Sequence, residues 1–265
     1  MAILRAFVMI VLLAPVAVVH VAAQSLGSFE LQARPKISGK QERITRKRFY
    51  LFAGGLAANK PLIDRLKASN ATSRDCFYCQ MKASAEYMAW LKEKDCESPY
   101  CRAITKDDVA KVPEFQVAYN KGLGPRQFAG KTNVALTWLT SNLAPNLRDG
   151  FYRQRKSLID TLLTGLKPVQ TAMTDSSKSS VALFVDIPLK PPVPGGKASE
   201  TFLFSNLVPV EIGGKGYVWA CEIEIGPTKR AVASLKVPEG NKPVSKCEVI
   251  VKDLSVCEGG ICVQK

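Results

Sequence analysis

The stretch GYVWACEIEI, residues 216–225, indicates a β-strand because its side chains repeat with a period of two. One face of such a strand carries five apolar side chains: Tyr217, Trp219, Cys221, Ile223 and Ile225. Glu222 and Glu224 lie on the opposite face. This alternation is typical of an antiparallel sheet with one face packed and the other in water.

Five further segments have the length and composition of short strands. They are VALFVDI (181–187), TFLF (201–204), VPVEI (208–212), AVASLKV (231–237) and KCEVIVK (246–252). Stretches rich in proline and glycine, such as KPPVPGG (190–196) and PEGNKP (238–243), separate them as turns. Short strands at this spacing predict a small antiparallel β-sandwich or barrel-like domain over residues 181–265.

Residues 49–167 have the pattern of helices. Ser84 can cap the segment AEYMAWLKEKD, and Thr105 with Asp108 can form a capping box at the start of another helix. A longer helix is expected after Pro145. Its apolar stripe would consist of Leu147, Phe151, Leu158 and Leu162.

Two polar segments flank this helical part. Residues 24–48 are expected to be a basic polar arm, and residues 168–180 a linker between the helices and the strands. The expected fold class is therefore α+β, with an N-terminal helical part followed by a disulfide-stapled antiparallel β domain.

Residues 1–23 have the features of a signal peptide. Arg5 precedes an apolar run, and Val21 and Ala23 supply the small residues that signal peptidase reads. No later segment reaches transmembrane length. We therefore expect a secreted or periplasmic protein with no transmembrane segment after signal removal.

The charge is strongly positive and unevenly distributed. The chain carries 37 Lys+Arg and 23 Asp+Glu, and residues 24–177 hold 25 basic and 14 acidic residues against 11 and 9 in residues 178–265. The single histidine, His20, lies in the expected signal peptide. The mature chain would have none, which excludes Ser-His-Asp and Cys-His catalysis as well as histidine-based zinc chemistry.

Eight cysteines follow the expected signal: Cys76, Cys79, Cys96, Cys101, Cys221, Cys247, Cys257 and Cys262. An even number of cysteines in an exported chain predicts a disulfide framework. A nested pairing would join Cys76 to Cys101 and Cys79 to Cys96. In the strand half, Cys221 would pair with Cys247 because both lie on apolar strand faces, and Cys257 would pair with Cys262 around the turn EGGI.

Two other interpretations of Cys76 and Cys79 remain open at this point. A C-x-x-C pair can be the active site of a thiol–disulfide oxidoreductase, although no strand is expected before Cys76. The first four cysteines also have spacing near that of a zinc ribbon. Covalent haem requires a histidine after the second cysteine, where the chain has Gln80.

The sequence assigns no catalytic residue, metal or cofactor, and we lean towards a protein that is not an enzyme. A secreted hydrolase based on two carboxylates is an alternative, since Glu222 and Glu224 point the same way from one strand. The more ordinary interpretation of these two residues is the solvated face of a strand.

Two clusters place cations beside aromatic residues, in RITRKRFYLF (43–52) and RDGFYRQRK (148–156). Their cations are Arg43, Arg46, Lys47, Arg48, Arg148, Arg153, Arg155 and Lys156. Such clusters can bind an anionic polymer or surface of the cell envelope or the extracellular space. No fold for sequence-specific nucleic-acid binding is recognisable. We therefore expect an exported binding or structural protein that engages an anionic partner through these residues.

Overall fold

The structure is a computed structural model that describes residues 25–124, 132–176, 179–191, 199–238 and 243–263. The expected signal peptide lies outside these residues. The strands are β1 (Leu26–Gln32), β2 (Lys36–Ile37), β3 (Lys40–Gln41), β4 (Arg48–Ala53), β5 (Gln170–Met173), β6 (Val181–Pro188), β7 (Glu200–Ser205), β8 (Val210–Ile212), β9 (Lys215–Ile225), β10 (Ala231–Ser234), β11 (Cys247–Asp253), β12 (Val256–Glu258) and β13 (Ile261–Val263). The helices are α1 (Lys60–Ala68), α2 (Arg74–Gln80), α3 (Ala85–Glu93), η1 (Pro99–Cys101), α4 (Lys106–Lys111), α5 (Pro113–Leu123), α6 (Thr132–Thr137), α7 (Leu139–Asn142), η3 (Asn146–Gly150) and α8 (Phe151–Leu162).

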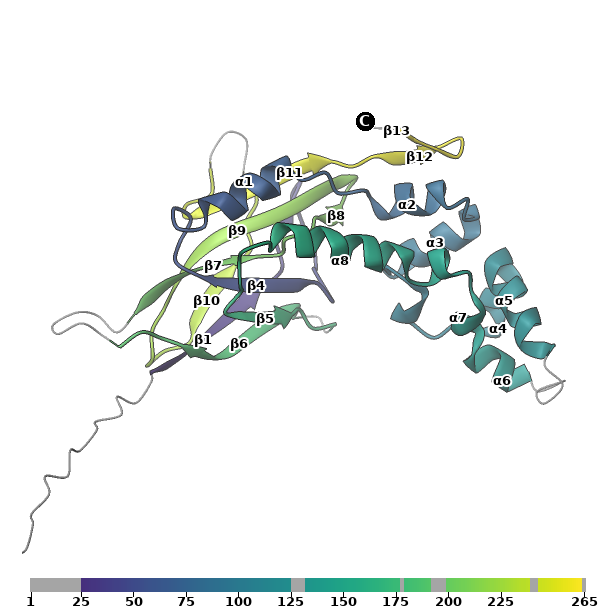
Figure 1. The fold of residues 1–265 in the computed structure, drawn as a ribbon, viewed down its shortest axis with the longest axis horizontal. Helices are drawn as coiled ribbons and strands as arrows, with labels where there is room; N and C mark the ends of the chain where they lie inside the picture. The colour runs from purple at the N-terminus through teal and green to yellow at the C-terminus, as the bar shows by residue number, and fades with distance from the viewer. Residues whose placement is uncertain (1–24, 125–131, 177–178, 192–198, 239–242, 264–265) are drawn as a thin grey trace, which may run out of the picture.

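The molecule is elongated, with a β region at one end and a helical region at the other (Figure 1). The β region comprises β1 and β4–β11, and the helical region comprises α2–α7. Helix α8 runs from the helical region along the β region, near α1. The fold is α+β, as the sequence predicts, and each of the six strand segments expected after residue 180 is confirmed.

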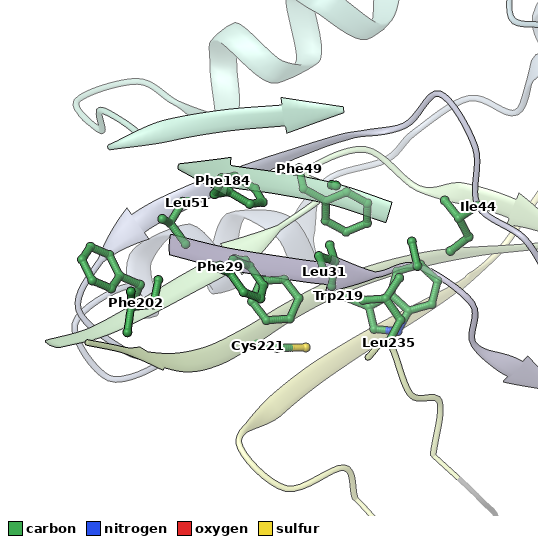
Figure 2. Close-up of a cluster of buried hydrophobic side chains, with 14 of the residues drawn as sticks. Phe29, Leu31, Ile44, Phe49, Leu51, Phe184, Phe202, Trp219, Cys221 and Leu235 are labelled. Atoms are coloured by element: carbon green, nitrogen blue, oxygen red, sulfur yellow. The ribbon is translucent and has the colours of Figure 1, made fainter. Parts of the chain in front are cut away.

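The β region consists of two sheets. One has the strand order β10-β1-β6 and the other the order β11-β9-β7-β4-β5, with β8 also paired to β9. Their apolar faces enclose one core, in which Phe29 stacks on Phe184 with ring centroids 5.3 Å apart and lies 5.2 Å from Phe204. Figure 2 shows Phe29 and Phe184 gathering between the strands with Trp219 and Leu31.

The N-terminal segment differs from the expected polar arm. Residues 24–48 contain strand β1, which lies between β6 and β10, pairing antiparallel with the first and parallel with the second. Phe29 and Leu31 alternate with Glu30 and Gln32, so that the two apolar side chains enter the core. The β region is therefore built from both ends of the chain, with the helical region inserted between β4 and β5.

The outer face of the larger sheet is not solvated as the alternation in β9 suggested. Val218 and Ala220 are buried beneath helices α1 and α8, which contribute Leu62, Leu66 and Leu162 to a second core. Strand β9 is consequently buried on both faces over most of its length.

The helical region has a separate core that is rich in aromatic residues. Tyr87 contacts Phe115 edge-on at 5.5 Å, and Phe115 in turn contacts Trp90 at 4.9 Å. The expected caps are confirmed, since Ser84 accepts a hydrogen bond from the Tyr87 amide and Thr105 forms the capping box with Asp108.

The long helix expected after Pro145 begins with one π-helical turn, η3, before α8 starts at Phe151. At the junction, a Cβ atom added to Gly150 would lie 2.8 Å from the ring of Phe77. Glycine at this position thus permits the close approach of α2 to the start of α8.

The four disulfide bonds join Cys76 to Cys262, Cys79 to Cys257, Cys96 to Cys101, and Cys221 to Cys247. The bridge between Cys221 and Cys247 was predicted correctly, because the two residues are cross-strand partners on β9 and β11. The other three predicted pairings are wrong. Cys76 and Cys79 on α2 instead form disulfide bonds with the C-terminal hairpin, defined as β12–β13 (Val256–Val263). The paired residues are 186 and 178 positions apart in the sequence.

Two features of the described residues concern membrane spans and metal binding. No helix in this part of the chain is long and apolar enough to cross a membrane. Within the same part, histidine, cysteine, aspartate and glutamate side chains form no group of three or more that could hold a metal ion. The eight cysteines are all in disulfides, which contradicts both a zinc site and a Cys76–Cys79 redox pair.

Candidate anion-binding pocket

The residues that precede β4 join the β region to the helical region. The Arg46 guanidinium donates to the carbonyl oxygens of Lys94 at 2.8 Å and of Cys101 at 3.2 Å. The Lys47 ammonium pairs with the carboxylates of Glu97 at 2.6 Å and Asp95 at 3.4 Å. Both cations therefore hold the loop that the Cys96–Cys101 disulfide closes.

Glu97 is shared by two cations from different parts of the chain. Its carboxylate accepts hydrogen bonds from Lys47 and from the buried guanidinium of Arg155 on α8, which also donates to the carbonyl of Pro209. Burial alone would raise the pKa of Glu97, but the two cations outweigh it and lower that pKa to about 2. Glu97 is thus ionised at neutral pH and neutralises much of the charge of Lys47 and Arg155.

A second carboxyl group, Glu211 on β8, responds to burial in the opposite direction. It accepts a hydrogen bond from the backbone amide of Arg74 at 2.8 Å, at the start of α2. Burial raises the pKa of Glu211, and the nearby Arg155 and Arg74 only partly oppose that rise. The junction therefore contains one stabilised and one destabilised carboxylate.

A pocket of about 360 Å³ opens beside this junction, between β4 and α8. This volume is within the range of small-molecule sites. The pocket has five cationic and two acidic lining residues: Arg46, Lys47, Arg48, Arg155, Lys156, Glu97 and Asp160. Its lining therefore has a net formal charge of three positive units.

Two of these cations, Arg48 on β4 and Lys156 on α8, are exposed at the mouth of the pocket. Within the described part of the chain, neither has a carboxylate oxygen within ion-pair distance. Two tyrosines flank them. Burial raises the pKa of Tyr50 although the positive charge of Arg48 opposes that rise, and Tyr152 on α8 is exposed.

The apolar lining comes from three elements. Helix α8 and the residue after it contribute Ile159 and Leu163, β5 contributes Met173, and the segment from the β7–β8 connection into β8 contributes Val208 and Val210. Met173 is 51% exposed although it belongs to a strand. The pocket thus combines a cationic mouth with an apolar wall.

Five of the eight predicted binding residues line this one pocket, namely Arg46, Lys47, Arg48, Arg155 and Lys156. The structure brings these residues together from segments about a hundred positions apart in the sequence. The other three do not line it: Arg43 is exposed elsewhere, and Arg148 and Arg153 pair with Asp149.

Sequence reasoning missed the pocket residues outside the two basic clusters. Asn206, Val208 and Val210 follow β7 in a segment whose apolar composition indicated a strand and gave no sign of a ligand. Glu97 lies beside Cys96, and its role depends on the fold of a loop that no local pattern predicts.

The carboxylates Glu222 and Glu224 have structural partners. Glu222 accepts a hydrogen bond from the Leu56 amide at 2.6 Å, and Glu224 accepts one from the Ser199 hydroxyl at 2.6 Å. Each side chain therefore fixes a neighbouring loop. A larger open cavity of about 870 Å³ lies beside the Cys221–Cys247 bridge, and no site is assigned there.

Comparison of the chain with family models, with curated proteins and with solved structures found no match.

Proposed function

We propose that the protein is an exported, disulfide-stabilised binding protein that engages an anionic partner through the pocket between β4 and α8. The observation that supports this proposal most strongly is the pair Arg48 and Lys156. They come from different elements, lie at the mouth of one pocket, and have no carboxylate partner among the described residues. Two cations that line one pocket and form no ion pair with a carboxylate attract an anion.

The covalent framework is consistent with an extracellular or periplasmic location. The four disulfide bonds are of the kind that form and persist in oxidising compartments. The signal-like residues 1–23 give a route to such a compartment.

Binding is favoured over catalysis by the arrangement of the reactive groups. The four sulfurs that join α2 to the C-terminal hairpin are paired between elements, so Cys76 and Cys79 are not bonded to each other as an oxidoreductase pair would be. Glu222 and Glu224 hold loops and do not face each other across a cleft.

Retention on immobilised heparin tests the proposal with charge-matched variants. The variant Arg48→Gln/Lys156→Gln removes two charges at the pocket mouth. The control Lys106→Gln/Lys111→Gln removes two charges from the exposed surface of α4. We expect the pocket variant to elute at a lower salt concentration than the control, because it removes a site and not only net charge. Equal elution of the two variants would show that retention is a non-specific effect of the basic surface and would contradict the proposal.

A further inference from the structure

The polar groups inside the pocket are already occupied by partners within the protein. The Asn206 amide donates to the carbonyls of Val208 at 2.8 Å and Tyr217 at 3.0 Å, and its oxygen accepts from the Trp219 amide at 2.8 Å. Glu97 and Arg155 are paired with each other. A ligand inside the pocket therefore gains little by hydrogen bonding to these groups, since each new bond would replace an existing one.

The remaining interior surface is apolar. Ile159 and Leu163 are four residues apart, so they lie on one face of the α8 end, and Met173, Val208 and Val210 complete the wall. Contact of this surface with an apolar group removes water from both and favours binding.

The mouth has the opposite character. Arg48 and Lys156 offer donors and positive charge, and Asp160, four residues after Lys156 on α8, also lines the pocket. Arg48, Lys156 and Asp160 together carry one of the three net positive charges of the lining, which favours an anionic group at the mouth.

From this separation of polar and apolar surfaces we infer that the pocket binds an anionic amphiphile, with its head group between Arg48 and Lys156 and its apolar tail against Ile159, Leu163 and Val208. This inference rests on the proposed function and specifies its ligand class. A long polyanion could contact only the mouth, whereas an amphiphile uses both parts of the pocket.

Titration calorimetry with laurate below its micelle concentration tests the inference. Dodecyltrimethylammonium has a similar tail with the opposite charge, and inorganic phosphate has charge without a tail. We expect laurate to bind at one site and both other probes to bind at least about tenfold more weakly, a factor equivalent to about 1.4 kcal/mol.

Two variants separate the contributions of head and tail. Val208→Phe adds a ring at a half-buried position of the apolar wall and leaves the cations in place. It should weaken laurate binding about tenfold or more while heparin retention is unchanged. Arg48→Gln/Lys156→Gln should weaken both laurate binding and heparin retention. The control Lys106→Gln/Lys111→Gln should weaken neither of them. Thermal unfolding of each variant checks that it is folded.

The outcomes distinguish the inference from the function on which it rests. If heparin retention depends on Arg48 and Lys156 but laurate does not bind, the amphiphile inference is wrong and the anion site stands. Binding to vesicles that contain phosphatidylglycerol, without binding of monomeric laurate, would also overturn the inference, because it would indicate a surface contact and not an occupied pocket. Vesicle binding that laurate competes away would support a lipid as the source of the amphiphile.

Discussion

In the β region one continuous apolar core lies between two hydrogen-bonded sheets. The helices of the helical region, in contrast, are short and are attached to the rest of the molecule by disulfide bonds and ion pairs. The core around Phe29 and Trp219 is enclosed by strands from both ends of the chain. Helix α2 has only seven residues, yet it carries two bridges to the C-terminal hairpin and receives the Glu211 carboxylate at its first amide. Short helices gain little stability alone. The β region can therefore hold its fold by burial, whereas the helical region depends on its attachments.

The largest expected effect comes from the core of the β region. Phe29→Ala should lower the free energy of unfolding by about 4 kcal/mol, because it leaves a cavity between Phe184 and Phe204. Urea unfolding followed by Trp fluorescence measures this loss. The matched change Phe115→Ala, at a fully buried site of the helical core, should remove amide-exchange protection mainly from the helical region. Equal loss of protection in both regions from Phe115→Ala would contradict the difference drawn between them.

Removing the two long-range bridges should have the next largest effect. Replacing Cys76, Cys79, Cys257 and Cys262 by serine should cost about 3 kcal/mol, since each bridge restricts the unfolded chain over more than a hundred residues. Hydrogen exchange should show α2 and the C-terminal hairpin losing protection first, while β7 and β9 keep theirs.

The control for this change is the short bridge. Replacing Cys96 and Cys101 by serine opens a loop closed over a separation of 5 residues, and the cost should be smaller, about 2 kcal/mol. Early loss of protection in β9 from the quadruple variant would show that the bridges support the β region as well.

The ion cluster between the two regions should contribute less than the bridges. Glu97→Gln leaves Lys47 and Arg155 without the carboxylate they share and should cost about 2 kcal/mol. Chemical unfolding at pH 7 measures it. The exposed pair of Lys60 and Asp64 is the control, and Asp64→Asn should change stability by about 0.5 kcal/mol or less. A similar cost for both variants would mean that Glu97 contributes only as a surface charge.

The pH dependence of stability gives the most selective effect. The pKa of Glu97 falls from 4.5 to about 2 on folding, so its contribution is fully present above pH 4.5 and is lost as the pH falls towards 2. The pKa of Glu211 is raised, so its contribution is present at low pH and is lost as the pH rises through that raised value.

Unfolding free energies measured from pH 2.5 to pH 7 should therefore respond to the two carboxyls with opposite signs. Glu97→Gln should flatten the acid decrease in stability. Relative to the wild-type protein, Glu211→Gln should raise the free energy of unfolding more at pH 7 than at pH 3. The substitution removes a buried charge and keeps an acceptor for the Arg74 amide. A parallel response of the two variants would contradict these assignments.

The parts of the fold that the sequence predicts are those with local signals. Alternation predicted the six strands after residue 180, and side-chain caps predicted the starts of α3 and α4. The alternation in LGSFELQ was also present, but the charged residues around it led to the expectation of an arm. Strand β4 is buried on both faces, and such an apolar run does not distinguish a strand from a buried helix.

The pairing of cysteines shows where local reasoning ends. Cys221 and Cys247 could be paired because both lie on apolar faces of neighbouring strands. Cys76 and Cys79 bond to residues near the other end of the chain, and this depends on where the C-terminal hairpin packs. The lining of the candidate pocket was predicted only in part for the same reason. Composition located the cations, but only the fold shows that Arg48 and Lys156 share a pocket while Arg148 and Arg153 do not.

Peptide mapping of the non-reduced protein tests most directly whether the helical region is covalently attached through α2. Chymotrypsin can cleave after Phe77 or Tyr78, between Cys76 and Cys79, and a glutamate-specific protease can cleave after Glu258, between Cys257 and Cys262. Together they separate the four half-cystines for mass spectrometry. We predict linked peptides that join Cys76 to Cys262 and Cys79 to Cys257. A Cys76–Cys79 bridge, or unmodified thiols at these positions, would contradict the structure of the junction on which the pocket depends.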